Sequence, residues 1–295
     1  MEAASRREFL ATGAAIATPF ATRGAADPGT SARPGLLAGK VAVIYGAAGA
    51  IGGAVSRAFA REGAQLFLAG RTLERVAGVA RELAETGALV EAALVDAMER
   101  DAVEKHLADV VRTAGRVDIS FNLIGLGGEQ GRLLTAMTLE AFDLPISNAM
   151  RTHFITATAA ARHMEGRGSG VILALTAQVA RKPYVASGGF GVACAAIEGL
   201  SRQLAIELGP KGIRVVTLRS SGSPDTPGVA AAVAEHARAA GVTREVFEAR
   251  IAEKTMLKRM PKMAEIANAA VLAASDRASA LTAAVINVTC GEIAD

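Results

Sequence analysis

A glycine-rich stretch between two apolar segments is where residue types and spacing first indicate chemistry. Val41 to Tyr45 is a short apolar run, Gly46, Gly49 and Gly52 follow among small residues, and Ile51 to Glu62 carries apolar side chains at helical spacing. This pattern predicts a buried strand, a tight turn and a helix. A turn without Cβ atoms lets a phosphate reach backbone N–H groups, and the helix N-terminus adds partial positive charge. The stretch is either a pyrophosphate site or an ordinary strand-to-helix turn, and its place among the other elements decides between them.

The rest of the chain alternates between apolar strands and amphipathic helices. Further strands are expected over 65–69, 89–95, 119–124, 171–176, 214–218 and 285–288, with helices over 73–86, 100–114, 150–164, 190–208 and 266–274. This alternation predicts an α/β fold, a single Rossmann-type, doubly wound parallel sheet of about seven strands over residues 40–295. Helical material over 222–260, including Arg244 to Lys254, interrupts the alternation and is expected to form a lid before the last helix and strand. The glycine stretch therefore opens a strand-helix-strand unit, which favours a dinucleotide ligand.

The end of the second strand indicates which dinucleotide is bound. A site for NAD(H) usually has an acidic residue there for the ribose hydroxyls, whereas this chain has Gly70-Arg71. A guanidinium matches a 2′-phosphate in charge and geometry, so NADP(H) is favoured over NAD(H). The alternative is that Arg71 is a solvated surface residue.

Several motifs occur in the order found in the short-chain dehydrogenase/reductase family. Tyr45-Gly46-Ala47-Ala48-Gly49-Ala50-Ile51-Gly52 resembles T-G-x-x-x-G-x-G, and Asn122-Leu123-Ile124-Gly125 resembles N-N-A-G. Gly212-Ile213-Arg214-Val215 matches G-I-R-V before the sixth strand, and Ile286-Asn287-Val288 resembles the last strand. The resemblance runs from about Leu37 to Asp295. It implies cofactor contacts at the following residues: Gly46, Gly49, Ile51, Gly52, Arg71, Asp96 (toward adenine), Asn122 and Gly125.

The catalytic residues that the resemblance implies are replaced in this chain. Family enzymes use a Tyr as general acid/base, a Lys four residues later, a Ser on the substrate oxygen and an Asn in a proton relay. The corresponding positions here hold Phe190, Cys194, Ala177 and Ala149. A benzyl ring cannot donate a proton, and a positioned acid or base contributes about 10²–10⁴ in rate. The ordinary carbonyl-to-alcohol reaction is therefore not expected by the family's usual route.

Weak substitutes stand near these positions. Tyr184 lies in the loop after the fifth strand, Thr176 ends that strand, and Asn148 is one residue before the Asn position. Loop solvation and helix packing are the alternative explanations for these residues and for Arg181, Lys182 and His153. Arg219-Ser220-Ser221-Gly222 stands where the family usually has P-G, so a polar, anion-accepting loop is possible there.

The N-terminal segment and the overall composition restrict cell location and partners. Ser5-Arg6-Arg7-Glu8-Phe9-Leu10, a weakly apolar stretch and Gly24-Ala25-Ala26 resemble a twin-arginine export signal over 1–26, with a linker over 27–39; a disordered tail in a cytoplasmic protein is the alternative. The apolar stretch is too short for a stable membrane span. The net charge of +3 and the absence of basic blocks beside aromatics argue against nucleic acid, and the two cysteines have no metal-ligand spacing. We expect no metal.

Two classes of function remain open from the sequence. One is an atypical NADP(H)-dependent oxidoreductase for a small carbonyl, alcohol or activated alkene; the other is a non-catalytic nucleotide- or ligand-binding protein that kept the fold. The Ala-rich helices Met150 to Met164 and Ala193 to Leu208 resemble the pair that family members use to form dimers and tetramers.

Overall fold

Seven parallel strands form the centre of the molecule. The computed structural model describes residues 34–295, in which the strands are β1 (Val41–Tyr45), β2 (Gln65–Gly70), β3 (Val90–Leu94), β4 (Ile119–Asn122), β5 (Gly170–Ala177), β6 (Ile213–Ser220) and β7 (Ala284–Val288). They lie in the order β3-β2-β1-β4-β5-β6-β7, and every neighbouring pair is parallel. The predicted doubly wound sheet is confirmed. The strand order reverses at β1 and β4, where folds of this kind bind ligands beyond the carboxyl ends of the strands.

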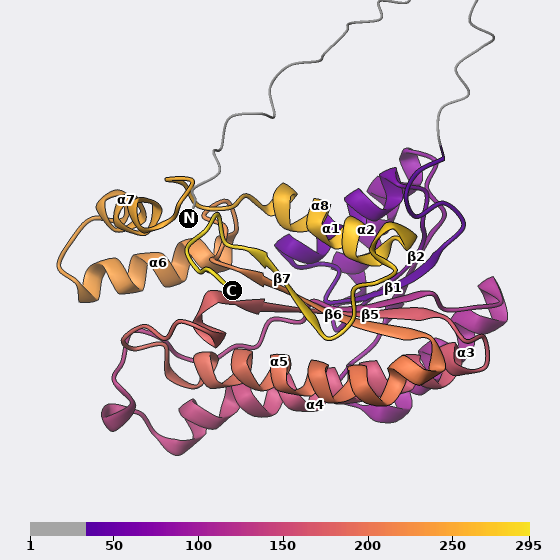
Figure 1. The fold of residues 1–295 in the computed structure, drawn as a ribbon, viewed down its shortest axis with the longest axis horizontal. Coiled ribbons are helices and arrows are strands. Elements are labelled where there is room, and N and C mark those ends of the chain that lie inside the picture. The colour runs from indigo at the N-terminus through magenta and orange to yellow at the C-terminus, as the bar shows by residue number, and fades with distance from the viewer. Residues whose placement is uncertain (1–33) are drawn as a thin grey trace, which may run out of the picture. The chain divides into compact units, whose positions relative to one another are not determined.

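Helices cover both faces of the sheet, as Figure 1 shows. One face carries α1 (Ala50–Arg61), α2 (Leu73–Glu85) and α8 (Met263–Ala274), and the other carries α3 (Arg100–Ala114), α4 (Leu139–Glu165) and α5 (Gly188–Leu208). Short 3-10 turns are found at Leu134–Ala136, Gln178–Ala180, Gly209–Lys211 and Asp276–Ala278.

Strand β1 illustrates why the sheet is buried on both sides. All five of its residues are buried, and successive side chains enter opposite apolar clusters. Ile44 packs under α1 and α8, whereas Val43 packs on the side of α3 and α4. A continuous apolar run is what a strand buried on both faces requires.

Helix α4 begins at Leu139 and contains the predicted helical stretch from Met150 to Met164. The hydroxyl of Thr138 accepts a hydrogen bond from Ala141 N at 3.2 Å, which caps the start of the helix. The first turns of α4 pack directly on α5, because a Cβ at Gly189 would lie only 1.9 Å from the carbonyl oxygen of Phe142. The close approach of these backbones sets the position of the α5 segment that carries Phe190 and Cys194.

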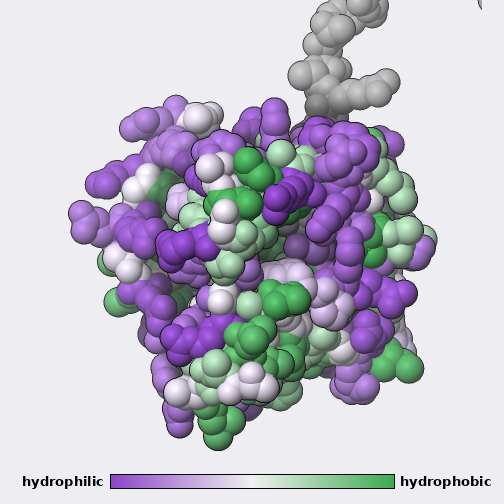
Figure 2. Space-filling view, turned by 90° about the vertical axis from the view of Figure 1, so that its left-hand side faces the viewer, coloured by the Kyte–Doolittle hydropathy of each residue, from purple (hydrophilic) through white to green (hydrophobic). Residues whose placement is uncertain are grey.

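Two further helices form the predicted lid between β6 and α8. They are α6 (Pro227–Ala239) and α7 (Arg244–Lys254), capped by the hydroxyls of Thr226 and Thr243. Both lie at the end of the molecule where the carboxyl ends of the strands meet (Figure 1). Figure 2 looks onto this end, where apolar surface lies among hydrophilic side chains.

The stretch that was predicted as a linker partly belongs to the domain. Leu37 is fully buried in the core beneath α1, and its N–H donates to Glu62 O at 3.0 Å. The domain therefore includes residues from Pro34 onward. The predicted linker over 27–39 extends too far, because Leu37 is buried in the core. The predicted export signal over 1–26 lies outside the described residues. Among the residues described, no helix is long and apolar enough to cross a membrane.

Candidate active site

The glycine turn between β1 and α1 has no room for side chains. Gly46 has a φ of +74°, and a Cβ there would lie 2.6 Å from Leu123 O. A Cβ at Gly52 would lie 2.2 Å from Gly46 O. Gly49 caps α1 with extended backbone, and no side chain bonds the first N–H groups of the helix. Gly49 and Ala50 are exposed, so the donors of this helix end face outward and fit a pyrophosphate.

Basic side chains stand beside this turn. Arg71 is exposed directly after β2, and Arg75, one turn into α2, places its Nη2 3.4 Å from Ala48 O. Arg75 was not predicted, although it lies only four residues after Arg71 in the sequence. A Cβ at Gly70 would lie 2.9 Å from Val76 Cγ2, so a larger residue at this point would require the Val76 side chain to shift.

The other predicted cofactor residues surround the same edge of the sheet. Asp96 follows β3, and its Oδ1 accepts from Met98 N at 3.0 Å. Asn122 ends β4; its Oδ1 accepts from Ile124 N at 3.0 Å and its Nδ2 donates to Thr156 Oγ1 at 3.3 Å. Asn122 therefore holds the loop after β4 against α4. Gly125 lies exposed in that loop.

The positions of the family's catalytic residues are packed with apolar groups. Cys194 is 1% exposed and Ala149 is fully buried, while Ala177 and Phe190 are partly buried. Burial raises the pKa of the Cys194 thiol to about 12, although a hydrogen bond with the Ala177 backbone opposes the shift. The Ser and Lys positions are therefore adjacent, but alanine has no titratable group and the Cys194 thiol stays protonated at neutral pH.

The structure does not bring the three substitute candidates together. Tyr184 donates its hydroxyl proton to Gln130 Oε1 at 2.9 Å, in the loop after β4. Thr176 donates to Glu198 Oε1 at 3.0 Å, and Asn148 donates to Leu126 O at 3.0 Å. Thr176 and Asn148 therefore support the backbone and the helix around the site.

Tyr184 belongs to a cluster that joins the lid to the loops after β4 and β5. His236 of α6 lies edge-on to the Tyr184 ring at 5.3 Å, stacks on Phe247 of α7 at 6.2 Å, and has its Nε2 3.3 Å from Gln130 Oε1. Burial raises the pKa of Tyr184 to about 12, and the negative charge of Glu292 adds to the shift. The sequence did not identify Gln130 or His236 as site residues, because the residues that they contact lie on distant segments of the chain.

A buried ion pair is the feature that the sequence analysis did not find. The Nε and Nη2 atoms of Arg219, at the end of β6, donate to the two carboxylate oxygens of Glu198 on α5, both at 2.8 Å. The side chains are 4% and 6% exposed. The Arg219 loop had been interpreted as polar and anion-accepting, but nothing in the sequence pattern identified Glu198 as its partner.

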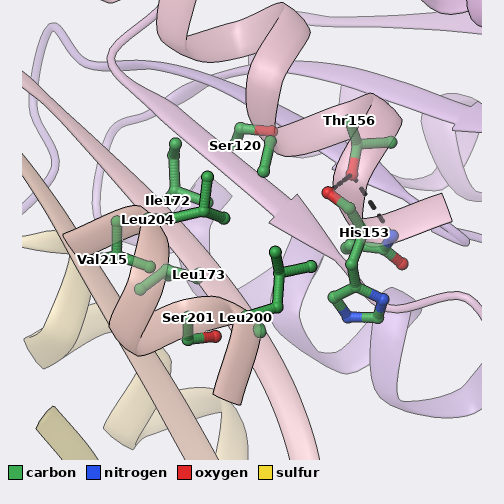
Figure 3. A pocket seen from close by; sticks show the side chains of 12 residues that line it. Ser120, His153, Thr156, Ile172, Leu173, Leu200, Ser201, Leu204 and Val215 are labelled. Atoms are coloured by element: carbon green, nitrogen blue, oxygen red, sulfur yellow. Dashed lines mark hydrogen bonds between the residues drawn. The ribbon is translucent and has the colours of Figure 1, made fainter. Parts of the chain in front are cut away.

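His153, another candidate, lies away from the carboxyl edge. Its Nδ1 contacts Ala149 O at 2.9 Å, and its Nε2 has no partner among the described residues. It lines a cavity of about 10 Å³, enough for one water molecule, together with Ser120 and Ser201 (Figure 3). Burial lowers the pKa of His153 to about 4, so the imidazole is neutral. No group of three or more His, Cys, Asp or Glu side chains suited to a metal occurs within residues 34–295.

Comparisons with known proteins agree with this geometry. The family model described as Enoyl-(Acyl carrier protein) reductase matches residues 46–292. The chain is 27% identical over 264 residues to 7alpha-hydroxysteroid dehydrogenase of Escherichia coli K12, covering 87% of this chain and 95% of that protein. It is similar to a solved putative short-chain dehydrogenase/reductase from Burkholderia xenovorans, at 26% identity and a TM-score of 0.76 over 88% of this chain and all of that one. A solved 7 alpha-hydroxysteroid dehydrogenase complexed with NADH and 7-oxo glycochenodeoxycholic acid has 25% identity and a TM-score of 0.76, covering 88% and 96% of the two chains.

Proposed function

The chain belongs to the short-chain dehydrogenase/reductase family, and from that premise we propose an oxidoreductase that binds NADP(H) and reduces a small carbonyl or activated alkene without the family's Tyr-Lys pair. The observation that carries the proposal is the turn at Gly46 and Gly52, where a Cβ would collide with backbone at 2.6 Å and 2.2 Å. Two such glycines beside an exposed helix end without a side-chain cap are the arrangement that a bound pyrophosphate requires.

Several residues of this chain would hold the cofactor. The N–H groups at Gly49 to Gly52 would bind the pyrophosphate, Asp96 and Gly125 would flank the adenosine, and Arg71 would pair with a 2′-phosphate. Arg75 supports the preference for NADP(H), because its guanidinium adds a second positive charge beside the turn.

A nicotinamide cofactor, when bound, would supply hydride, and the chain would supply the proton. Tyr184 is the acid we propose, because its phenol lies in the loop after β5, at the edge of the sheet that holds the glycine turn, and donates a hydrogen bond to Gln130 Oε1. With a pKa of about 12, only about one phenol in 10⁵ is ionised at pH 7. The phenol of Tyr184 is therefore protonated at pH 7 and can donate a proton to a developing alkoxide.

A titration of the purified full-length chain with NADPH and NADH tests the proposal. Because the chain has no Trp, the readout is the fluorescence of the nicotinamide itself. NADPH is expected to bind more tightly, and Arg71→Ala is expected to remove most of that preference. Arg81→Ala, an exposed position further along α2, is the matched control. Equal binding of both cofactors by the unaltered protein would refute the preference, and binding of neither would refute the proposal.

The packing at the catalytic positions favours a second candidate function. Cys194 and Ala149 are buried, and no cation stands where the family's Lys would hold the nicotinamide ribose. The second candidate is a ligand-binding protein that keeps the cofactor turn without turnover. Tight NADPH binding with no consumption of NADPH across a panel of aldehydes, ketones and enones would favour it over the reductase.

Assembly into a homodimer or homotetramer forms part of the proposal. Helices α4 and α5 pack side by side and leave large apolar side chains exposed, including Phe154, Val192 and Ile206. Light scattering that gives the mass of a monomer would rule this assembly out.

Export by the twin-arginine route is also proposed, on the order of the residues in 1–26. The protein would then leave the cytoplasm folded, with its cofactor already bound. Fractionation that finds the full-length chain only in the cytosol would refute export.

A further inference from the structure

Arg219 has one donor that its buried partner does not use. Its Nε and Nη2 atoms bind Glu198, whereas its Nη1 atom donates to the carboxylate of Asp295. The Arg219 side chain is 4% exposed and that of Asp295 is 40% exposed. Asp295, the more exposed of the two, therefore occupies the guanidinium nitrogen that Glu198 leaves free.

The guanidinium lies next to the positions of the family's reaction. Arg219 is paired in register with Thr176 of β5, one residue before Ala177. Glu198 is one helical turn beyond Cys194 on α5. A carboxylate bound to Nη1 would therefore lie close to a carbonyl group that occupied the Ser and Tyr positions.

Asp295 is carried by a short segment that folds back after β7. The side chain of Asn287 donates to Ile293 O at 2.7 Å, and the chain turns through Cys290 and Gly291 with φ values of +54° and +78°. Left-handed φ is unfavourable for a cysteine, so this turn holds some strain.

The same segment buries a carboxylate that lacks a full set of partners. Glu292 Oε1 is 3.8 Å from Lys182 Nζ, and Oε2 is buried without a hydrogen-bond partner among the described residues. An unpaired buried carboxylate oxygen destabilises the covering position. The contact of Asp295 with Arg219 therefore holds in place a segment that the turn at Cys290 and the unpaired oxygen of Glu292 both destabilise.

We propose that Arg219 Nη1 is a recognition site for a carboxylate on the ligand, and that Asp295 occupies this site as an internal substitute. Combined with the proposed reductase, on which this substrate assignment rests, the site specifies a small oxo acid, a molecule with a carbonyl near a carboxylate. The charge count favours a single negative charge. Arg219 faces two carboxylates, those of Glu198 and Asp295, so a monocarboxylate that replaces Asp295 leaves the local charge balance unchanged, whereas a phosphate dianion makes it more negative.

Chemical rescue of Asp295→Ala in the full-length chain tests the site. The melting temperature is measured against formate and acetate, with chloride at equal ionic strength as the reference and inorganic phosphate as the dianion. The variant is expected to show a saturable rise in melting temperature with the monocarboxylates and a weaker one with phosphate. Because the tethered carboxylate competes at an effective concentration in the millimolar range, the unaltered protein is expected to bind formate at least about tenfold more weakly.

Controls separate this site from general salt effects. Asp109 is also 40% exposed and pairs with Lys105 on the surface, so Asp109→Ala should show no saturable response to formate. Combining Asp295→Ala with Glu198→Leu and Arg219→Met should abolish the response. If the alanine variant fails to fold, Asp295→Asn, which keeps the side-chain volume, takes the same measurement.

A folded Asp295 variant without a saturable response to formate or acetate would overturn the proposal, and so would a response that persists without Arg219. The assay contains no nicotinamide cofactor. A negative rescue result therefore says nothing about cofactor binding. If the titration instead shows no cofactor binding, the carboxylate site is retained but is no longer assigned to a reductase.

Discussion

Removal of one partner of the buried Arg219–Glu198 pair should be among the most damaging single changes in this protein. Both side chains are at least 94% buried, and two parallel hydrogen bonds of 2.8 Å join them. The Glu198 hydrogen bonds raise the pKa of Arg219, so the guanidinium stays charged. Arg219→Met would leave the Glu198 carboxylate buried without a cation, at a cost of about 3–5 kcal/mol in the free energy of unfolding.

Replacement of both partners should be far less harmful. Glu198→Leu with Arg219→Met exchanges the ion pair for apolar groups of similar volume and leaves no buried charge, since the remaining partner, Asp295, is 40% exposed. We expect the double variant to lie within about 1–2 kcal/mol of the unaltered protein. The coupling energy between the two sites should then be about 3 kcal/mol or more, as in other networks with shared partners.

The contact between Arg219 and Asp295 contributes little to this difference. Asp295 is 40% exposed, so its loss should cost no more than about 1 kcal/mol, the value of a surface pair. Asp295→Asn measures this directly, and Asp109→Asn, with the same exposed fraction, is the matched control.

Urea unfolding followed by circular dichroism gives the required values for the single and double variants. A total stability of about 5–15 kcal/mol leaves the Arg219→Met variant measurable at low temperature. The reasoning is refuted if Arg219→Met costs less than about 1 kcal/mol, or if the double variant loses the sum of the two single effects.

Three further predictions follow from the site. Gly52→Ala should abolish binding of both nicotinamide cofactors and lower the melting temperature, because the new Cβ meets Gly46 O at 2.2 Å; unchanged affinity in the titration would contradict the geometry. The pKa of His153 in the folded protein is about 4, below the ordinary 6.5, so its contribution to stability is complete above pH 6.5 and is lost as the pH falls toward 4. The free energy of unfolding should fall by about 2 kcal/mol between pH 7 and pH 5. Urea titrations of His153→Gln should not show this loss. Phe190→Tyr with Cys194→Lys should raise the rate of carbonyl reduction by about 10²-fold or more if the nicotinamide is bound in the correct position. A rate of NADPH consumption no higher than that of the unaltered protein would mean that the nicotinamide end of the site is blocked.

The sequence by itself determined the class of fold and the position of the glycine turn between the first strand and the first helix. Both depend on short-range properties: the alternation of apolar strands with amphipathic helices, and the exclusion of Cβ atoms from a turn of seven residues around Gly49. The loss of the acid/base pair was also readable, because a phenyl ring at 190 and a thiol at 194 lack the required protons wherever the chain places them. These inferences need only the chemistry of single residues or of neighbours along the chain.

Only the tertiary structure decided which polar groups meet. Tyr184 and Gln130 are 54 residues apart, Arg219 and Glu198 are 21 apart, and Arg219 and Asp295 are 76 apart, so no local pattern pairs them. Their contacts follow from the register of β5 against β6 and from the packing of α5 on the sheet. Register and packing depend on the burial of apolar surface from the whole chain, and a side chain such as Leu37, assigned by composition to a linker, joins the core for the same reason.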